Sequence, residues 1–271
     1  MDNITSDLVL IGVDTHKDIH VAVAINGLGA RLGSKAIPTT SRGYQELENW
    51  ARALGTIHAF GIEGTGSYGA GLTRMLHNQG HRVVEVNRTN RQLRRQHGKS
   101  DPIDAEAAAR AVLAGEADAT PKTGGGCAEM IRHLKIARET AVKCRTQAMV
   151  TLKSILVNAP QTVRDQFQKS NGTMSLVRSL AALRPGELIS TVASAKTALR
   201  SLARRWLALN AETEALDQQL TALAHAHAPE LMAAPGISTQ TVAEMTVSVG
   251  DNPERIRSEA AFAKLCGACP I

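Results

Sequence analysis

Residues 8–14 read LVLIGVD, an unbroken apolar run that ends on a carboxylate. A continuous apolar run of this length is typical of a strand that is buried on both faces. Two shorter strands are predicted at His20–Ile25 and Ala30–Ile37, and Asn26-Gly27 between them is a hairpin signal. The sequence therefore predicts a sheet whose central strand is residues 8–13 and whose first three strands are joined by hairpins.

Helices and strands alternate after these three strands. We predict a helix at Ser41–Leu54, a strand at Ile57–Ile62, a helix at Ser67–Leu76, a strand at Arg82–Val86 and a helix at Asp101–Leu113. Asp101 is predicted as the N-cap of the last helix, with Pro102 in its first position. The order βββαβαβα predicts an α/β domain with a mixed sheet, because crossover helices join parallel strands.

The chain becomes helical from about residue 126. Two series of mostly apolar residues recur at alternating spacings of three and four, which predicts coiled-coil helices. The series are Met130, Leu134, Ala137, Ala141, Cys144, Ala148, Thr151, Ile155 and Leu199, Leu202, Trp206, Leu209, Thr213, Leu216, Leu220, Leu223. A pair of core helices in a compact bundle is the alternative. We predict three parts: an α/β domain at 1–120, an all-α helical region at 121–229, and a small C-terminal unit at 230–271.

Composition excludes several classes of protein. Hydrophobic residues make up 43% of the 271 residues, which is enough for a core and excludes general disorder. We find no signal peptide, and the apolar runs are too short to span a bilayer. Four cysteines in a chain of this size indicate a reducing compartment. We therefore expect a soluble protein of the cytoplasm that does not contact a membrane.

The net charge of +6 is concentrated in two basic tracts. Residues 132–205 contain 14 basic residues against 3 acidic ones, and residues 82–99 contain 6 against 1. Two such tracts are typical of a protein that binds a polyanion, although each tract alone could be a solvated helix face. We predict that nucleic acid is bound by Arg88, Arg91, Arg94, Arg95, Lys99, Arg132, Lys135 and Arg138.

Four carboxylates occupy related places in the predicted domain. Asp14 ends the first strand, Glu63 ends the fourth, and Asp101 and Asp104 lie three residues apart at a helix start. Four acids at one edge of a sheet cannot all stay ionised unless cations neutralise them, which predicts Mg²⁺ or Mn²⁺ and phosphodiester chemistry. Taken singly, each acid has a structural alternative, namely a cap, a turn or a pair with an arginine.

Other motifs suggest different chemistry. Residues 64–69, GTGSYG, fit the GxGxxG fingerprint of dinucleotide binding, with Glu85 about 20 residues on, but they follow the fourth strand and come directly after Glu63. An actin-like ATPase would place phosphate at the turn after Asp14, but it needs a second domain with strands. Cys266 and Cys269 have the spacing of zinc ligands without a second pair.

Three of these segments resemble the motifs of one recombinase group. Residues 12–18 (GVDTHKD), 61–68 (GIEGTGSY) and 99–105 (KSDPIDA) are similar to the four-acid, or DEDD, motifs of the insertion-sequence-110 kind of transposases, which are related to the Piv-type DNA invertases. Residues 234–237, 249–251 and 261–267 are similar to the start of that family's C-terminal transposase domain. The resemblance covers nearly the whole chain in the same order.

The resemblance implies a RuvC-like, RNase H-like first domain that binds Mg²⁺ (or Mn²⁺) through Asp14, Glu63, Asp101 and Asp104 as catalytic residues. It also implies a coiled coil that assembles a homo-oligomer, and the cutting and joining of DNA in a bacterial cell under the guidance of a structured RNA. We then expect the protein at the nucleoid when it is bound to DNA.

The family's serine nucleophile lies beyond a stretch like Leu265–Pro270, and no serine here matches that position. The resemblance therefore predicts a C-terminally truncated transposase. The alternatives are an inactive oligomer that binds nucleic acid and a RuvC-like, metal-dependent nuclease.

Overall fold

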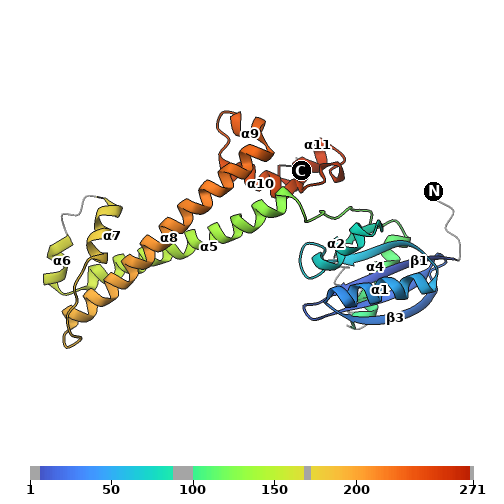
Figure 1. Cartoon of the computed structure of the whole chain (residues 1–271), viewed down its shortest axis with the longest axis horizontal. Helices are drawn as coiled ribbons and strands as arrows, with labels where there is room; N and C mark the ends of the chain where they lie inside the picture. The colour runs from blue at the N-terminus through green and yellow to red at the C-terminus, as the bar shows by residue number, and fades with distance from the viewer. Residues whose placement is uncertain (1–6, 88–99, 168–171, 269–271) are drawn as a thin grey trace. The chain divides into compact units, whose positions relative to one another are not determined.

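The computed structural model describes residues 7–87, 100–167 and 172–268 (Figure 1). These residues form two compact units, one made of Met1–Glu129 with Ser248–Ile271 and the other of Met130–Val247. None of the described helices combines the length and apolar character that a membrane span requires.

A five-stranded mixed sheet forms the centre of the first unit. Its strands are β1 (Leu8–Thr15), β2 (Ile19–Asn26), β3 (Arg31–Pro38), β4 (Thr56–Glu63) and β5 (Val83–Val86), in the order β3-β2-β1-β4-β5. Strand β1 pairs antiparallel with β2 and parallel with β4, β2 pairs antiparallel with β3, and β4 pairs parallel with β5. The apolar run that ends at Asp14 is therefore the central strand, as predicted.

Helices cover both faces of this sheet (Figure 1). Helices α1 (Ser41–Leu54) and α2 (Ala70–Asn78) bury apolar side chains against one face, and α4 (Asp101–Leu113) packs against the other. Alternate residues of β1 enter the two cores, Ile11 on the side of α1 and Leu10 on the side of α4. This arrangement confirms the predicted α/β class and is RNase H-like.

Two predicted helix starts are wrong by one to three residues. Helix α2 begins at Ala70 and not at Ser67, because a turn comes first. In this turn the backbone amides of Ser67 and Gly69 donate to the carbonyl of Gly64, and Gly64 has a φ of +69°. The N-cap of α4 is Ser100, in an extended conformation, so that Asp101 lies inside the first helical turn.

The second unit is helical. Its elements are α5 (Cys127–Asn158), α6 (Gln161–Phe167), α7 (Thr173–Ala181), α8 (Thr191–His227), α9 (Pro229–Ala233) and α10 (Thr239–Val249). Helices α5 and α8 run side by side and antiparallel (Figure 1). Arg138 donates a hydrogen bond to Asp217, and Arg145 donates one to Asn210. A step of seven residues forward along α5 therefore matches a step of seven residues back along α8.

At half of the predicted positions, the residue that faces the seam between α5 and α8 is the next one along the chain. Ala141 and Ala148 are buried as predicted, but Met130 and Cys144 are exposed, and Ile131 and Leu152 are buried in place of Met130 and Thr151. Helix α8 shows the same offset: Ala203 and Ala224 are buried in place of Leu202 and Leu223. The corrected repeat places Arg138, Arg145, Asn210 and Asp217 in the seam, where the prediction allowed mostly apolar residues.

The C-terminal residues of the first unit bind the segment that precedes α5. The carboxylate of Asp251 accepts hydrogen bonds from the backbone amides of Ala128 (2.8 Å) and Gly126 (3.1 Å), as an N-cap side chain does. Asn252 accepts from the amide of Thr123 and donates to the carbonyl of Pro121. A short 3₁₀ turn (Pro253–Arg255) and α11 (Glu259–Leu265) follow.

A buried carboxylate links α1 to the start of β5. The side chain of Glu48 is 2% exposed and accepts hydrogen bonds from His81 Nε2 (2.8 Å) and Arg52 Nη2 (2.7 Å). Burial raises the pKa of Glu48, but the hydrogen bonds from His81 and Arg52 outweigh burial and hold the pKa below its ordinary value. The ionised form of Glu48 therefore stabilises the folded state.

We predict that Glu48→Gln lowers the free energy of unfolding by about 1–3 kcal/mol at neutral pH. Because the folded pKa is lowered, the stabilisation is complete above the unfolded pKa of about 4.3 and is lost as pH falls through the folded value. Urea unfolding of both proteins as a function of pH measures this. Glu46→Gln, at a more exposed position on the same helix, is the control. A difference that stays constant down to the lowest pH at which the protein folds would contradict the prediction.

Candidate active site

Asp14 and Glu63 lie side by side because their strands are parallel neighbours. Val13 of β1 is in register with Ile62 of β4, so the residue that follows each of them lies at the carboxyl edge of the sheet. The hydroxyl of Thr15 donates to the carbonyl of Glu63 (2.8 Å) and ties the two strand ends together. Two carboxylates from distant parts of the chain thus meet at one sheet edge.

Helix α4 contributes Asp101 and Asp104 from its first turn. The helix can reach this position because the strands beneath it carry glycine. A Cβ atom on Gly12 would lie 1.8 Å from the carbonyl oxygen of Ala105, and one on Gly61 would lie 2.9 Å from that of Ala108. The backbone of α4 therefore rests directly on β1 and β4, and its N-terminal turn lies over their carboxyl ends.

The four acids line one cavity of about 470 Å³, together with His16, Ser67, Tyr68 and Glu85, among others. Asp14 and Asp104 are 7% and 8% exposed, whereas the side chain of Asp101 is about half exposed. The structure thus brings together all the acids that the sequence singled out, on one side of the sheet. Their catalytic and metal-binding roles remain predictions.

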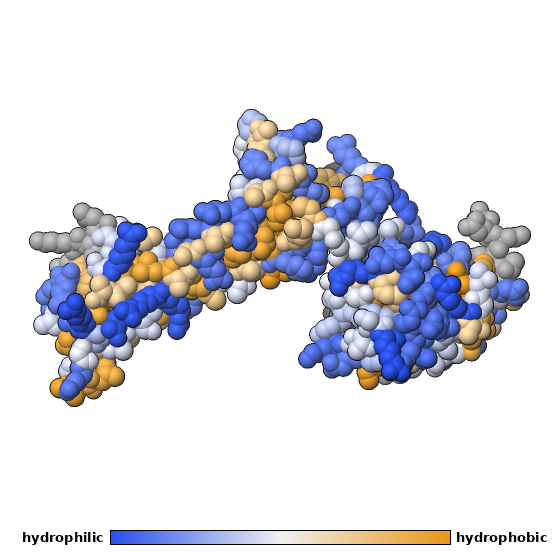
Figure 2. Space-filling view, viewed as in Figure 1, coloured by the Kyte–Doolittle hydropathy of each residue, from blue (hydrophilic) through white to orange (hydrophobic). Residues whose placement is uncertain are grey.

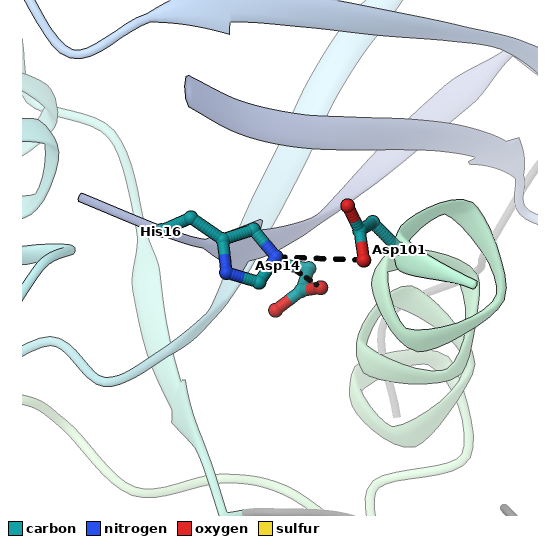
Figure 3. Close-up of side chains that lie close together, drawn as sticks. All are labelled: Asp14, His16 and Asp101. Carbon is teal, nitrogen blue, oxygen red and sulfur yellow. Dashed lines mark hydrogen bonds and ion pairs between the residues drawn. The ribbon is translucent and has the colours of Figure 1, made fainter. Parts of the chain in front are cut away.

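His16 joins two of these acids (Figure 3). Its Nε2 atom is 3.1 Å from Oδ2 of Asp14 and 3.5 Å from Oδ1 of Asp101. Burial raises the pKa of Asp14, the neighbouring charges of Asp104 and Asp101 raise it further, and His16 acts in the opposite direction. The site therefore has an excess of negative charge that a cation would relieve.

The residues of the cavity fit a divalent metal ion. Carboxylate oxygens are the preferred ligands of Mg²⁺ and Mn²⁺. One ligand atom each from Asp14, His16 and Asp101 lies within 4.8 Å of the others, and Glu63 and Asp104 line the same cavity. The donor set therefore suits a divalent ion, which would also offset the neighbouring negative charges that help to raise the pKa of Asp14.

Sequence reasoning did not assign two polar residues of the cavity to the site. It gave His16 no role of its own and considered Glu85 only beside the glycine motif, yet both line the cavity. His16 lies two residues after Asp14 and Glu85 lies in β5, next to β4. The places of these two residues in the sequence, near the carboxyl ends of neighbouring strands, were the signal that could have identified them as part of the site.

The glycine-rich loop forms the turn between β4 and α2. The carbonyl of Gly64 accepts hydrogen bonds from the amides of Ser67 (2.9 Å) and Gly69 (3.1 Å) and from the hydroxyl of Ser67 (3.1 Å). These two amides are used within the loop and do not point at a ligand, unlike the amides of a phosphate-binding turn. The loop borders the acid cavity, which weakens the dinucleotide interpretation further.

The predicted nucleic-acid residues fall into two groups. Arg88, Arg91, Arg94, Arg95 and Lys99 lie outside the described residues, as does Cys269 of the proposed zinc spacing. In α5, Lys135 forms ion pairs with Glu139 and Glu244, Arg138 pairs with Asp217, and Arg132 also has a partner. Binding of nucleic acid by these residues remains a prediction.

Two protein-family models match the chain. Residues 11–159, which include all four acids, match a model of the DEDD IS110 type described as Transposase. Residues 228–271 match a model described as Transposase IS116/IS110/IS902 family. The first match spans more than half of the chain, and the two follow one another in sequence. No curated protein matches the chain.

We predict that Gly12→Ala destabilises the first unit by about 3 kcal/mol, at the upper end of the range for overpacking, because its Cβ would overlap the backbone of α4. Urea unfolding measures the loss. Gly33→Ala in β3 is the matched control: its Cβ would lie 3.4 Å from the ring of Trp50, an ordinary packing distance. Equal stability of the two variants would show that the contact between α4 and β1 does not constrain this fold.

Proposed function

The chain belongs to the IS110 family of transposases, and we propose that it cuts and joins DNA at specific sites. The observation that carries the proposal is the convergence of Asp14, Glu63, Asp101 and Asp104, from three separate elements, on one cavity. Carboxylates gathered in this way suit phosphodiester chemistry. Family membership makes the chain a DNA-processing enzyme in general terms, and the site chemistry is our proposal.

We propose that the four acids hold Mg²⁺ or Mn²⁺. When bound there, the ion would neutralise the carboxylates and polarise the phosphodiester for attack. The chain itself would position the acids: β1 and β4 present Asp14 and Glu63 at adjacent strand ends, and α4 presents Asp101 and Asp104. Burial of Asp14 and Asp104 excludes water from part of the site, which strengthens their interaction with a cation.

We propose DNA and a structured guide RNA as partners. The basic excess over residues 132–205 supports binding of a polyanion. Within this tract several basic residues are exposed in the described structure, among them Lys143, Lys153, Arg164, Arg178 and Arg184. With the arginines of residues 88–95, they would contact phosphates and not bases, so binding would weaken with salt.

We also propose a homo-oligomer assembled through the coiled coil. In the corrected repeat of α5, Ile136, Val150 and Val157 share one heptad position on the side opposite the seam with α8. All three are exposed, although residues at this position are usually polar. Leu188 and Ile189 are exposed between α7 and α8, where Figure 2 shows a patch of apolar residues. We retain the division into 1–120, 121–229 and 230–271 as part of this proposal.

We predict that Asp14→Asn abolishes metal-dependent strand cleavage while leaving DNA binding intact. Loss of several kcal/mol of metal-assisted stabilisation of the transition state would lower the rate of cleavage at least roughly a hundredfold. The assay mixes the chain with guide RNA, donor DNA, target DNA and Mn²⁺, and follows cleaved and joined products and, separately, the binding of DNA. Glu116→Gln, an exposed acid beyond the end of α4, is the control. Products formed equally well by Asp14→Asn, or in excess chelator, would contradict the proposal.

We predict that Val150→Glu with Val157→Glu weakens self-association by at least about a hundredfold, because each change places a charge on an apolar contact. Sedimentation equilibrium of the full chain measures the association constant. Ser154→Glu adds a charge to an exposed polar position of the same helix and should change association much less. A monomeric wild-type chain, or association unchanged in the double variant, would rule out this face as the interface.

A further inference from the structure

We propose that His16 is a direct ligand of the metal ion at the four-acid site and binds it through Nε2. This inference rests on the proposed function, since it concerns the same ion, and it adds a nitrogen to a set of ligands that would otherwise be carboxylate oxygens. Asp14, His16 and Asp101 each offer one ligand atom, and the three atoms lie within 4.8 Å of one another (Figure 3).

Besides the hydrogen bond between Nε2 and Asp14, the distances around Nε2 suit a shared ion. One N–H points at one acceptor, yet Nε2 faces Oδ2 of Asp14 at 3.1 Å and Oδ1 of Asp101 at 3.5 Å. Neighbouring ligands of an octahedral ion with bonds of about 2.1 Å lie roughly 3 Å apart. Nε2 lies close to that spacing from each of the two oxygens, which come from a strand end and from the start of α4, and all three atoms lie within 4.8 Å of one another.

The backbone at His16 is fixed in a way that suits a ligand. Its amide donates to Nδ1 of His20 (3.3 Å), which closes the turn between β1 and β2. His20 is fully buried and its ring stacks on Tyr44 with 5.8 Å between centroids. The residue that carries the imidazole is therefore held from the core side, while its ring lines the cavity. A histidine that only faced solvent would need neither the hydrogen bond from its backbone amide nor a ring that lines the cavity.

A nitrogen ligand has a consequence for the choice of metal. Carboxylate sites suit Mg²⁺ and Mn²⁺ alike, whereas imidazole nitrogen favours transition-metal ions over Mg²⁺. His16 should therefore raise affinity for Mn²⁺ more than affinity for Mg²⁺. This bias is a property of the binding equilibrium, so it can be measured without DNA and without turnover.

The experiment is pulsed electron paramagnetic resonance of Mn²⁺ bound to the full, untagged chain. We expect electron spin echo modulation from a directly bound ¹⁴N, replaced by a ¹⁵N signal when the protein contains ¹⁵N-histidine. The modulation should vanish in His16→Ala and in His16→Gln. His225→Ala, which removes an exposed histidine at the end of α8, should keep it. Mn²⁺ affinity should fall at least about tenfold in His16→Ala. It should fall less in His16→Gln, whose amide oxygen can still bind the ion.

The outcomes separate this inference from the proposed function. Binding of Mn²⁺ that depends on Asp14 but shows no nitrogen modulation, or modulation that persists in His16→Ala, overturns the role of His16 and leaves the four-acid site standing. Equal losses of Mn²⁺ and Mg²⁺ affinity in His16→Ala also overturn it. Failure of the wild-type chain to bind Mn²⁺ at all overturns the metal site itself, and the inference with it.

Discussion

The closest backbone contact at the site, between α4 and the glycine of β1, is the constraint on which the rest of this structure depends. Any side chain at residue 12 would overlap the carbonyl of Ala105, so the helix can cross the sheet at this depth only over glycine. That depth places the first turn of α4 over the carboxyl ends of β1 and β4. Asp101 and Asp104 then line the same cavity as Asp14 and Glu63. A packing requirement in the core thus fixes the spacing of the polar site.

The geometry that gathers the acids also opposes folding. Asp14 is buried beside two other aspartates, and both burial and their charges raise its pKa. The acids are carried on regular strands and a helix, so core packing supplies the free energy that holds them together. Without an ion, His16 is the group in contact with two of the carboxylates that acts against their repulsion. A site built this way is rigid before it binds a cation, which lowers the cost of binding.

The sequence was most informative where side-chain chemistry and periodicity agreed. The apolar run before Asp14 and the acids at the strand ends predicted the sheet and the candidate site, because the carboxyl ends of neighbouring parallel strands meet at one edge. The seam of the helical unit was predicted less well, because Arg138 and Arg145 occupy positions that a hydrophobic repeat assigns to apolar residues. The start of α2 depended on a turn around Gly64. His16 was missed although it lies two residues after Asp14, because its second contact, with Asp101, joins residues far apart in sequence.

The polar residues of the seam explain why the basic tract cannot act as one surface. Arg138 and Asp217 form an ion pair between α5 and α8, and Asp217 also accepts a hydrogen bond from Gln240 of α10. Lys135 of α5 forms an ion pair with Glu244, which also lies in α10. Polar pairs within such a seam favour one register, because sliding by a turn would leave charges unpaired. These residues therefore hold three helices in place, and a phosphate could recruit them only by breaking contacts that fix the helical unit. Under the proposed function, the exposed basic residues of the tract would therefore contact phosphates more readily than these paired residues.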